Sequence, residues 1–156
     1  MLLAIFSICA VLSSVSCDSE GWPAFSALIN SSPFYNRGEI IKYPVVKTNN
    51  GNFYNPATGV FTAGAAGFYF FHVNAQAQLG KVLSLGLYHN QVYVLSIYAS
   101  SSSHPHWANG SNGIVLKLNY GDTVCVKARG PSYLYGLAGP GDCCIQSVFA
   151  GFKVGA

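Results

Sequence analysis

The residues from Ala66 to Gln78 alternate between two kinds of side chain with a period of two. One set of alternate positions is apolar or small and comprises Gly67, Tyr69, Phe71, Val73, Ala75 and Ala77. Because successive side chains of a strand point to opposite faces of the sheet, this set predicts a strand with one face in a core. A strand of this length is typical of a large sandwich, and the turn clusters Asn49-Asn50-Gly51 and Asn55-Pro56-Ala57-Thr58-Gly59 precede it.

The opposite, outward face of this strand begins with two large aromatic side chains. Its members are Phe68, Phe70, His72, Asn74, Gln76 and Gln78. In a monomer Phe68 and Phe70 would be exposed to water, and each would forgo about 2 kcal/mol of burial. Apolar patches of this kind mark contact sites, and the simplest partner is another copy of the chain. We therefore predict that both rings lie in an interface between identical subunits.

A spacing of aromatic and glycine residues in the same region matches a known signature. Its members here are Asn49, Tyr54, Phe61, Gly67, Tyr69 and Phe71. The spacing resembles that of the C1q domain, the globular head of the complement recognition protein, whose jelly roll is shared with tumour necrosis factor ligands. Two positions depart from the family, because Tyr43 replaces a Phe and Val73 replaces an aromatic residue. Further landmarks of the family lie at Ala24–Ala27, Leu116–Val124 and Phe149–Phe152, so the resemblance covers residues 23–154.

This resemblance implies a fold and a class of function. The implied fold is all-β, a ten-stranded jelly-roll β-sandwich that assembles as a homotrimer around its outward aromatic faces. Secreted members without a collagen stalk are similar to soluble pattern-recognition lectins of innate immunity, which bind microbial or sialylated glycans. Two alternatives stay open, namely an extracellular matrix or structural protein and a receptor ligand of the tumour necrosis factor or cerebellin kind. Some members bind calcium near the top of the trimer, which makes Ca²⁺ the cofactor to test.

The amino-terminal residues predict export from the cell. Residues 2–12 are almost all apolar and are followed by Ser13-Ser14-Val15-Ser16, which is typical of a secretory signal peptide and its cleavage site. The run is too short to span a bilayer, so no transmembrane segment is expected. We assign residues 1–17 to the signal peptide, 18–22 to a short segment and 23–156 to one extracellular domain, with no Gly-X-Y stalk between them.

The composition favours a binding module made of strands and turns. Only 8% of the residues are charged, 14% are aromatic and 17 are glycine, as suits an all-β domain. The net charge of +3 is spread along the chain, so no nucleic-acid partner is expected. The sequence contains no Gly-x-Ser-x-Gly elbow, phosphate loop or His-Glu-x-x-His motif, and few carboxylates for acid–base catalysis. We therefore expect a binding protein rather than an enzyme.

Four cysteines remain if the signal peptide is cleaved after Ser16, namely Cys17, Cys125, Cys143 and Cys144, and cleavage one residue later leaves three. A bond between the adjacent Cys143 and Cys144 would be strained, because their Cα atoms are only about 3.8 Å apart. Alternation places Cys125 on the outward face of its strand, within reach of a loop cysteine. We predict a disulfide from Cys125 to Cys143 or Cys144, with the remaining thiol paired to Cys17 or to another chain.

Two long loops, at residues 100–113 and 129–142, carry the groups best suited to ligand binding. These candidates are His106, Trp107, Asn109, Arg129, Tyr133 and Tyr135. Aromatic rings stack on the apolar faces of sugars, amides bond sugar hydroxyl groups, and a guanidinium pairs with a carboxylate or phosphate. An equally open alternative is that the aromatic residues only pack the loops against the domain. Asn30 and Asn109 each begin an Asn-x-Ser acceptor for N-glycosylation.

A metal site has weaker support in the sequence. His104 and His106 flank a proline and lie on one side of an extended chain, where a weak transition-metal site could form. Calcium requires several oxygen ligands, and the whole chain has only five carboxylate side chains, Asp122 and Asp142 among them. The competing interpretation is that all four are ordinary polar surface groups.

Further strands are expected where apolar and β-branched runs lie between turn residues. They are Phe25–Ile29, Ile40–Val46, Val82–Tyr88 paired with Val92–Tyr98, Ile114–Asn119 paired with Thr123–Ala128, and the closing strand Val148–Val154. Leu83, Leu85 and Leu87 are expected to face the core. The turn at Asn90 and Gln91 lacks the Asn-Gly pair best suited to positive φ, so a different or looser turn is expected there.

Overall fold

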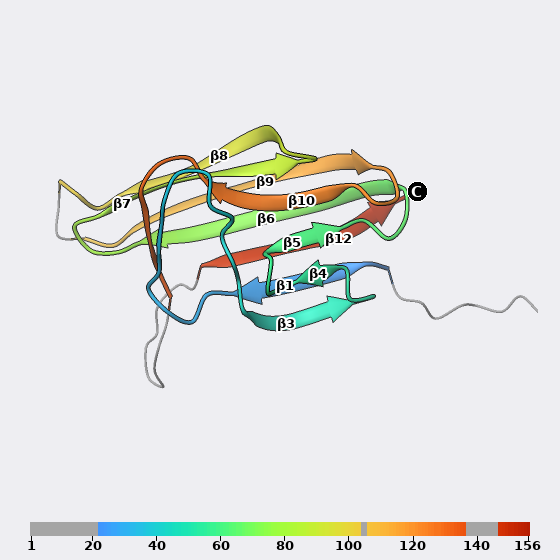
Figure 1. Cartoon of the computed structure of the whole chain (residues 1–156), viewed down its shortest axis with the longest axis horizontal. Coiled ribbons are helices and arrows are strands. Elements are labelled where there is room, and N and C mark those ends of the chain that lie inside the picture. The colour runs from blue at the N-terminus through green and yellow to red at the C-terminus, as the bar shows by residue number, and fades with distance from the viewer. Residues whose placement is uncertain (1–21, 104–105, 137–146) are drawn as a thin grey trace, which may run out of the picture.

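The computed structural model describes residues 22–103, 106–136 and 147–156, which form two antiparallel sheets packed face to face (Figure 1). Their strands are β1 (Ala24–Leu28), β2 (Phe34–Tyr35), β3 (Val45–Asn50), β4 (Tyr54–Asn55), β5 (Val60–Thr62), β6 (Gly67–Ala77), β7 (Val82–His89), β8 (Val92–Ser100), β9 (Ala108–Leu118), β10 (Thr123–Ala128), β11 (Ser132–Tyr135) and β12 (Val148–Gly155). The inner sheet has the order β2-β11-β6-β12-β1-β3, with β9 also paired to β6. The outer sheet has the order β4-β5-β10-β7-β8. This is the all-β jelly-roll sandwich that the sequence predicts. The structure describes more than the ten strands expected, because it also contains the short strands β2 and β11, which pair with each other. The pairing predicted between Ile114–Asn119 and Thr123–Ala128 was wrong, because β9 pairs with β6 of the inner sheet and β10 pairs with β5 and β7 of the outer sheet.

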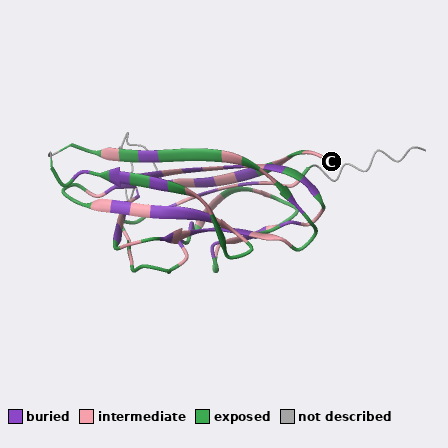
Figure 2. Ribbon diagram, turned by 90° about the horizontal axis from the view of Figure 1, so that it is seen from above, coloured by how far each residue is buried: buried purple, intermediate pink, exposed green. Residues whose placement is uncertain are grey.

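Strand β6 confirms the alternation predicted for it. Its inward side chains from Tyr69 to Ala77 are at most 1% exposed. Strand β9 pairs with it from Gly67, opposite Leu118, to Ala77, opposite Ala108, and β12 and β11 pair with its other edge. Buried and exposed residues alternate along the strands (Figure 2), so each sheet presents one face to the core. Within the described residues, no helix is long and apolar enough to span a membrane.

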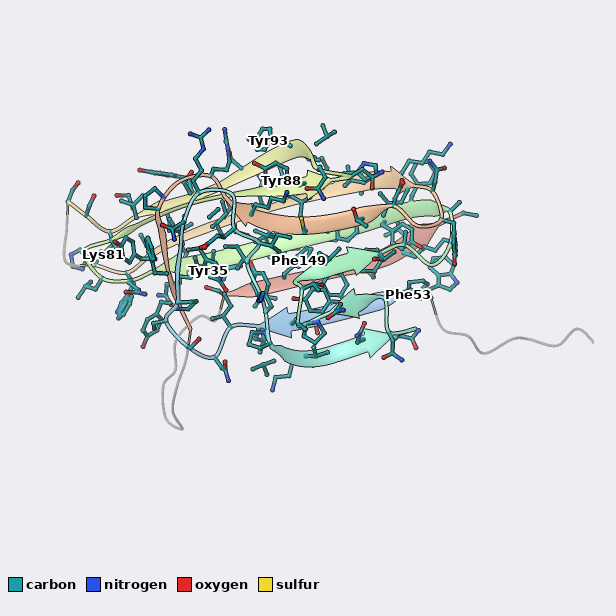
Figure 3. All side chains as sticks on the ribbon, in the orientation of Figure 1. Tyr35, Phe53, Lys81, Tyr88, Tyr93 and Phe149 are labelled. Carbon is teal, nitrogen blue, oxygen red and sulfur yellow. The ribbon has the colours of Figure 1, made fainter. Side chains whose placement is uncertain are left out.

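Six aromatic rings fill the centre of the space between the sheets. They are Phe25, Tyr54, Phe61, Tyr69, Phe71 and Phe149, each at most 3% exposed. Phe25 stacks on Tyr54 with ring centroids 4.8 Å apart and meets the Phe149 ring edge to face, also at 4.8 Å. Figure 3 shows Phe149 in the interior of the sandwich. The Tyr54 hydroxyl donates a hydrogen bond to the carbonyl of Tyr43 and accepts one from the backbone N–H of Tyr43. Burial raises the pKa of Tyr54 to about 12.

The outward face of the inner sheet carries an apolar strip, which we define as Phe68, Phe70, Val115, Phe152 and Val154. All but Phe70 are between 41% and 52% exposed. The half-buried Phe70 ring lies 5.6 Å from the Phe152 ring. Val115 and Phe152 flank Phe70 on the neighbouring strands, so the strip crosses β9, β6 and β12. The two phenylalanines predicted to point outward therefore belong to a larger apolar surface.

Gln76 departs from the alternation, because it is only 3% exposed although it lies on the outward face of β6. Asn109 of β9 and Tyr135 of β11 lie directly opposite it, one on each side. Its backbone N–H donates to the Ser147 hydroxyl over 3.1 Å. The side-chain Oε1 is buried and has no hydrogen-bond partner among the described residues. Neighbouring strands therefore cover a residue that the pattern alone places in solvent.

The loop predicted at residues 100–113 is shorter than expected, because β9 begins at Ala108. Asn109 and the four residues that follow it complete the pairing with the backbone of β6. Gly110 permits this course, since a Cβ there would lie 2.4 Å from the carbonyl oxygen of Tyr98. The need of β6 for a backbone partner therefore outweighs the polar character of the segment.

The turn between β7 and β8 is tight and both central residues have positive φ, as an Asn-Gly turn would, so the different or looser turn predicted there was wrong. Asn90 and Gln91 have φ angles of 47° and 70°, which lie in the left-handed region. The backbone N–H of Asn90 donates to the carbonyl of Thr123 over 2.9 Å, and the side-chain oxygen of Asn90 accepts from the backbone N–H of Thr123 over 2.8 Å. These bonds to β10 offset the cost of holding Asn90 and Gln91 at positive φ, a cost that glycine would not have.

The strand predicted at Ile40–Val46 is divided into two parts. Strand β3 begins only at Val45, and residues 38–41 form a strap that pairs with the end of β10. The Gly38 N–H donates to the Ala128 carbonyl over 2.8 Å, and the Ile41 N–H donates to the Val126 carbonyl over 2.8 Å. The strap therefore extends the outer sheet beyond β5, which pairs only with the first half of β10.

Candidate functional site

The six residues that the sequence suggests for binding lie in several places rather than one. Trp107 and Tyr135 form an aromatic pair with ring centroids 4.5 Å apart, and Trp107 is 46% exposed. Tyr133 lies earlier on β11, with its ring 4.7 Å from the Phe34 ring and 4.9 Å from the Nζ of Lys81. These residues form two separate sets of aromatic contacts on β11 and its neighbours, and neither includes Arg129.

His106 and Asn109 lie near Trp107 in sequence and are both exposed. The carbonyl oxygen of His106 accepts a hydrogen bond from the Ser101 hydroxyl. His104 and Asp142 lie outside the described residues. Within the part of the chain that the structure describes, no group of three or more His, Cys, Asp or Glu side chains is placed to hold a metal ion.

Arg129 lies in a pocket on the outer sheet, which we call the arginine pocket. The pocket has a volume of about 450 Å³ and is lined by Arg37, Gly38, Ser84, Tyr88, Tyr93, Ala128 and Arg129. Strands β7, β8 and β10 supply its floor and walls, and Figure 3 shows Tyr88 and Tyr93 close together on this sheet. None of the seven lining residues is acidic, so two guanidinium groups face the pocket without a carboxylate among them.

The side chain of Arg129 is fixed before any ligand arrives. Its backbone N–H donates to the carbonyl of Ser84 over 2.7 Å. Its guanidinium carbon lies 4.3 Å from the centroid of the Tyr93 ring, and Nη1 donates to the Tyr93 hydroxyl over 3.2 Å. The remaining N–H groups of the guanidinium are free to bind an acceptor. This arrangement lowers the conformational entropy that binding would otherwise cost.

A third cation lies beside the pocket. The Nζ of Lys127 is 5.1 Å from the centroid of the Tyr88 ring and donates a hydrogen bond to the side chain of Gln91. The rings of Tyr88 and Tyr93 meet edge to face, with centroids 5.8 Å apart. Lys127 therefore adds to the positive potential around the two tyrosines.

Gly86 forms the floor of the arginine pocket, although it does not line the open space. A Cβ at this position would lie 3.0 Å from Tyr88, 3.1 Å from Arg129 and 3.2 Å from Tyr93. Such contacts are tighter than van der Waals distance, so a side chain at residue 86 would require each of the three neighbours to move by a few tenths of an ångström.

Arg37 reaches the pocket because the strap holds its turn against β10. Gly38 has a φ of 92°, and the carbonyl of Glu39 accepts a hydrogen bond from the Ala128 N–H over 2.9 Å. The Glu39 carboxylate accepts from the Asn36 N–H over 2.6 Å. Glu39 therefore stabilises its own turn rather than joining the lining of the pocket.

Together these groups can bind an anion that is attached to an apolar ring. A guanidinium pairs bidentately with a carboxylate or phosphate, and an anion between two arginines offsets the repulsion between their like charges. The faces of Tyr88 and Tyr93 offer stacking area, and their hydroxyl groups offer hydrogen bonds. The volume lies within the range of small-molecule sites, about 300–1,000 Å³.

The sequence pointed to Arg129 but not to the rest of the arginine pocket. Arg37 lies in a turn marked only by Gly38, and its approach to β10 depends on the long-range pairing of the strap. Alternation with the inward leucines of β7 places Tyr88 on the outer face. Tyr93 has the same parity as the buried Ile97 and Ala99, and it reaches the outer face only because the register of β7 and β8 shifts between Leu87 and Tyr88, which the sequence does not show.

Asp122, named above among the candidate metal ligands, stabilises the turn regions instead. Its carboxylate accepts from the Asn90 side chain over 2.7 Å, from the Asn119 N–H over 2.9 Å and from the His89 ring over 3.0 Å. These hydrogen bonds, that from Asn90 first, lower the pKa of Asp122 from 3.8 to about 2. The same carboxylate therefore joins the β7–β8 turn to the β9–β10 turn.

This lowered pKa predicts how stability depends on pH. Because the folded chain holds the pKa of Asp122 below its unfolded value, the carboxylate stabilises the fold above about pH 4, and this contribution is lost as the pH falls through about 2. We expect the melting temperature of the Asp122→Asn variant to fall less steeply between pH 4 and pH 2 than that of the wild type. If the melting temperatures of the two proteins fall equally steeply with pH across this range, the assignment is contradicted.

Cys125 is 4% exposed, although the sequence placed it on an outward face. It lies between Val60 of β5 and Tyr88 of β7, and burial raises the pKa of its thiol. It is a free cysteine within the described residues. Its predicted partners Cys17, Cys143 and Cys144 lie outside them, so the proposed disulfide stays a prediction.

Residues 24–154 match the family model of the C1q domain. One of the subunits of the human complement C1q subcomponent is 31% identical over 132 residues, which are 83% of this chain and 49% of that protein. The heavy metal-binding protein HIP of Mytilus edulis is 30% identical over 138 residues, 84% of this chain and 60% of that protein. Human complement C1q tumor necrosis factor-related protein 2 is 32% identical over 102 residues, 65% of this chain and 34% of that protein. The chain thus spans between 34% and 60% of the length of these relatives.

Solved structures give the same result. The globular domain of zebrafish complement 1qA protein superposes with a TM-score of 0.68 at 26% identity, covering 85% of this chain and 97% of that one. The Eiger tumour necrosis factor of S. frugiperda superposes with a TM-score of 0.65 at 15% identity, covering 85% and 92%, which is a likeness of fold alone. The chain therefore belongs to the C1q domain family.

Proposed function

We propose that this chain is a secreted, multivalent lectin of innate immunity that recognises acidic glycans, microbial or sialylated, through the arginine pocket. The observation that carries the proposal is the convergence of Arg37, Arg129, Tyr88 and Tyr93 on one cavity without an acidic residue in its lining. An acidic sugar presents a carboxylate for the guanidinium groups and an apolar ring face for the tyrosines. Neutral sugars lack the first of these groups and should bind the pocket weakly.

Multivalency supports the same proposal. The apolar strip is a contiguous surface on three strands, and a homotrimer that buries it would carry three arginine pockets. Linking several weak sites raises the apparent affinity for a repetitive surface by about 10²–10⁴ without new contacts. A microbial glycan coat is such a surface. The arginine pocket lies on the outer sheet, so burial of the strip on the inner sheet leaves it open.

The matrix and receptor-ligand alternatives predict different binding behaviour. A matrix protein would become insoluble with its partners, and a receptor ligand would bind one membrane protein with nanomolar affinity or better. Neither alternative requires a cationic pocket with aromatic walls. The name of the Mytilus relative describes binding of heavy metals, and the described residues of this chain offer no ligand cluster for that function.

The proposal is tested by comparing Arg129→Ala with a matched loss of charge, Lys47→Ala, which lies exposed on β3 away from the pocket. We expect Arg129→Ala to weaken binding of sialyllactose at least about tenfold, because a charge-assisted pair contributes about 1.5–3 kcal/mol. Lys47→Ala should bind as the wild type does. Calorimetry on the soluble protein, with and without a calcium chelator, measures both effects and any requirement for Ca²⁺.

Two outcomes would contradict the lectin proposal. Equal losses in both variants would indicate a general attraction between a basic protein and an acidic ligand. Failure of the wild type to bind sialyllactose or any acidic member of a microbial glycan array would favour the matrix or receptor-ligand alternative.

A further inference from the structure

A second pocket lies at the end of the sandwich where the β3–β4 and β9–β10 turns meet. It has a volume of about 560 Å³ and is lined by Asn52, Phe53, Asn55, Thr62, Ala63, Gly64, Tyr120 and Gly121. It shares no lining residue with the arginine pocket. Figure 3 shows Phe53 well apart from Tyr88 and Tyr93. We call this cavity the amide pocket.

Backbone hydrogen bonds fix the walls of the amide pocket. The Thr62 N–H donates to the carbonyl of Phe53 over 2.8 Å, which joins the β3–β4 turn to β5. The Ala63 N–H donates to the carbonyl of Asp122, and the Gly121 N–H donates to the carbonyl of Ala63, each over 2.8 Å. These two bonds join the β9–β10 turn to the same segment. The cavity is therefore preformed rather than a gap between independent loops.

The ring of Phe53 is held between two glycines. A Cβ at Gly51 would lie 2.1 Å from the Phe53 ring, and one at Gly64 would lie 1.9 Å from it. The ring is half-buried, and its inner edge lies against Phe61, with centroids 6.5 Å apart. Tyr120, in the β9–β10 turn, is 79% exposed. Two aromatic side chains thus line the pocket, one fixed and one free to adjust.

The polar groups of the amide pocket are neutral, and several lack partners within the described part of the chain. Asn55 Oδ1 accepts from the Ala57 N–H over 2.9 Å, which fixes the amide and leaves its NH₂ group free. The Asn52 side-chain amide, the Thr62 hydroxyl and the Tyr120 hydroxyl make no hydrogen bond with another described residue. None of the eight lining residues is charged.

We infer that the amide pocket is a second carbohydrate site, which binds a neutral sugar. Phe53 and Tyr120 offer apolar faces for the carbon-bound hydrogens of a pyranose ring. The amides of Asn52 and Asn55 and the hydroxyl of Thr62 offer both donors and acceptors to sugar hydroxyl groups, which are themselves both. An anion would find no cation here, and a cation would find no carboxylate. The site goes beyond the acidic-glycan function proposed above and does not depend on it.

Two sites of different charge preference on one subunit would bind two kinds of sugar unit in a mixed polysaccharide. The arginine pocket would bind acidic units, and the amide pocket would bind neutral units of the same or a neighbouring chain. Their separation on the surface means that a substitution in one pocket leaves the other intact. This independence allows each proposal to fail without the other.

The experiment measures binding of three neutral probes, namely yeast mannan, a soluble β-1,3-glucan and chitin oligosaccharides, to the full secreted protein. Tyr120→Ala and Thr62→Val change the amide pocket, and both positions are exposed, so the fold should be retained. The matched control is Tyr98→Ala, which removes a tyrosine that is 61% exposed on β8 and lines neither pocket. Arg129→Ala serves as the variant of the other site.

We expect at least one neutral probe to bind the wild type and to lose about tenfold in affinity with Tyr120→Ala. Thr62→Val should weaken the same probe, whereas Tyr98→Ala and Arg129→Ala should not. Sialyllactose should give the opposite result, with Arg129→Ala weakened and Tyr120→Ala unchanged. The inference is overturned if no neutral probe binds, or if binding of a neutral probe is unaffected by both changes in the amide pocket. Loss of sialyllactose binding alone concerns only the acidic site.

Discussion

Phe149→Ala should lower the free energy of unfolding by about 3–5 kcal/mol, because it removes a ring from the centre of the sandwich. Phe149 is 0% exposed on β12 and packs against Phe25 at 4.8 Å, Tyr43 at 5.7 Å and Tyr54 at 6.0 Å between ring centroids. Both sheets contribute to this group of rings, so alanine would leave a cavity that neither sheet can close alone. A loss of this size is a large fraction of the stability of a domain.

The measurement is urea unfolding followed by fluorescence, with Phe34→Ala as the matched control. Phe34 is 45% exposed on β2, and its removal should cost no more than about 1 kcal/mol. A lower midpoint with an unchanged slope would identify the effect as a loss of stability rather than of compactness. If Phe149→Ala costs as little as the control, the ring cluster does not hold the two sheets together.

Replacing Phe68 and Phe70 together by Ser should convert the proposed trimer into a monomer. Phe68 is 42% exposed and Phe70 is half-buried, and both belong to the apolar strip on the inner sheet. Each ring gains about 2 kcal/mol on full burial, so three subunits that bury six rings would lose most of the energy of their association. The folded subunit should survive, because neither side chain contributes to the core between the sheets.

Light scattering after size-exclusion chromatography measures the mass of the assembly. The control is Val92→Ser, which removes an apolar side chain that is 68% exposed on β8 of the outer sheet. We expect the double variant to have the mass of one chain and the control to remain assembled. The monomer should keep its affinity for sialyllactose in solution while it loses retention on a glycan-coated surface. An unchanged mass for the double variant would reject the assignment of the apolar strip to the subunit interface.

The sequence predicts much of the fold, because alternating apolar residues mark the inward faces of β6 and β7. The alternate inward positions from Tyr69 to Ala77 and the three leucines of β7 are buried, as that alternation requires. The exceptions are residues whose environment is set by a distant strand. Gln76 is buried by β9 and β11, which flank it from opposite sides. Asn109 lies in a strand because β6 needs a partner there, although its own segment reads as a loop.

The two proposed sites were harder to predict from the sequence for a related reason. Arg129 stood out because it begins a long loop, but the side chains around it come from three strands and the strap. Phe53 reads as one aromatic residue among many, and the glycines that hold its ring are thirteen positions apart in sequence. Alternation gives the side of a sheet on which a residue lies. It does not give the neighbours that the topology places beside it.

The strap has a consequence beyond holding Arg37 in place. Residues 38–41 occupy the backbone of β10 just where β5 ends, so the free hydrogen-bonding groups of that strand are capped by the chain itself. An open edge of this kind is where sheets of separate molecules join and aggregate. The same short segment therefore covers a strand edge that could otherwise pair with another molecule, and it also holds Arg37 beside the arginine pocket.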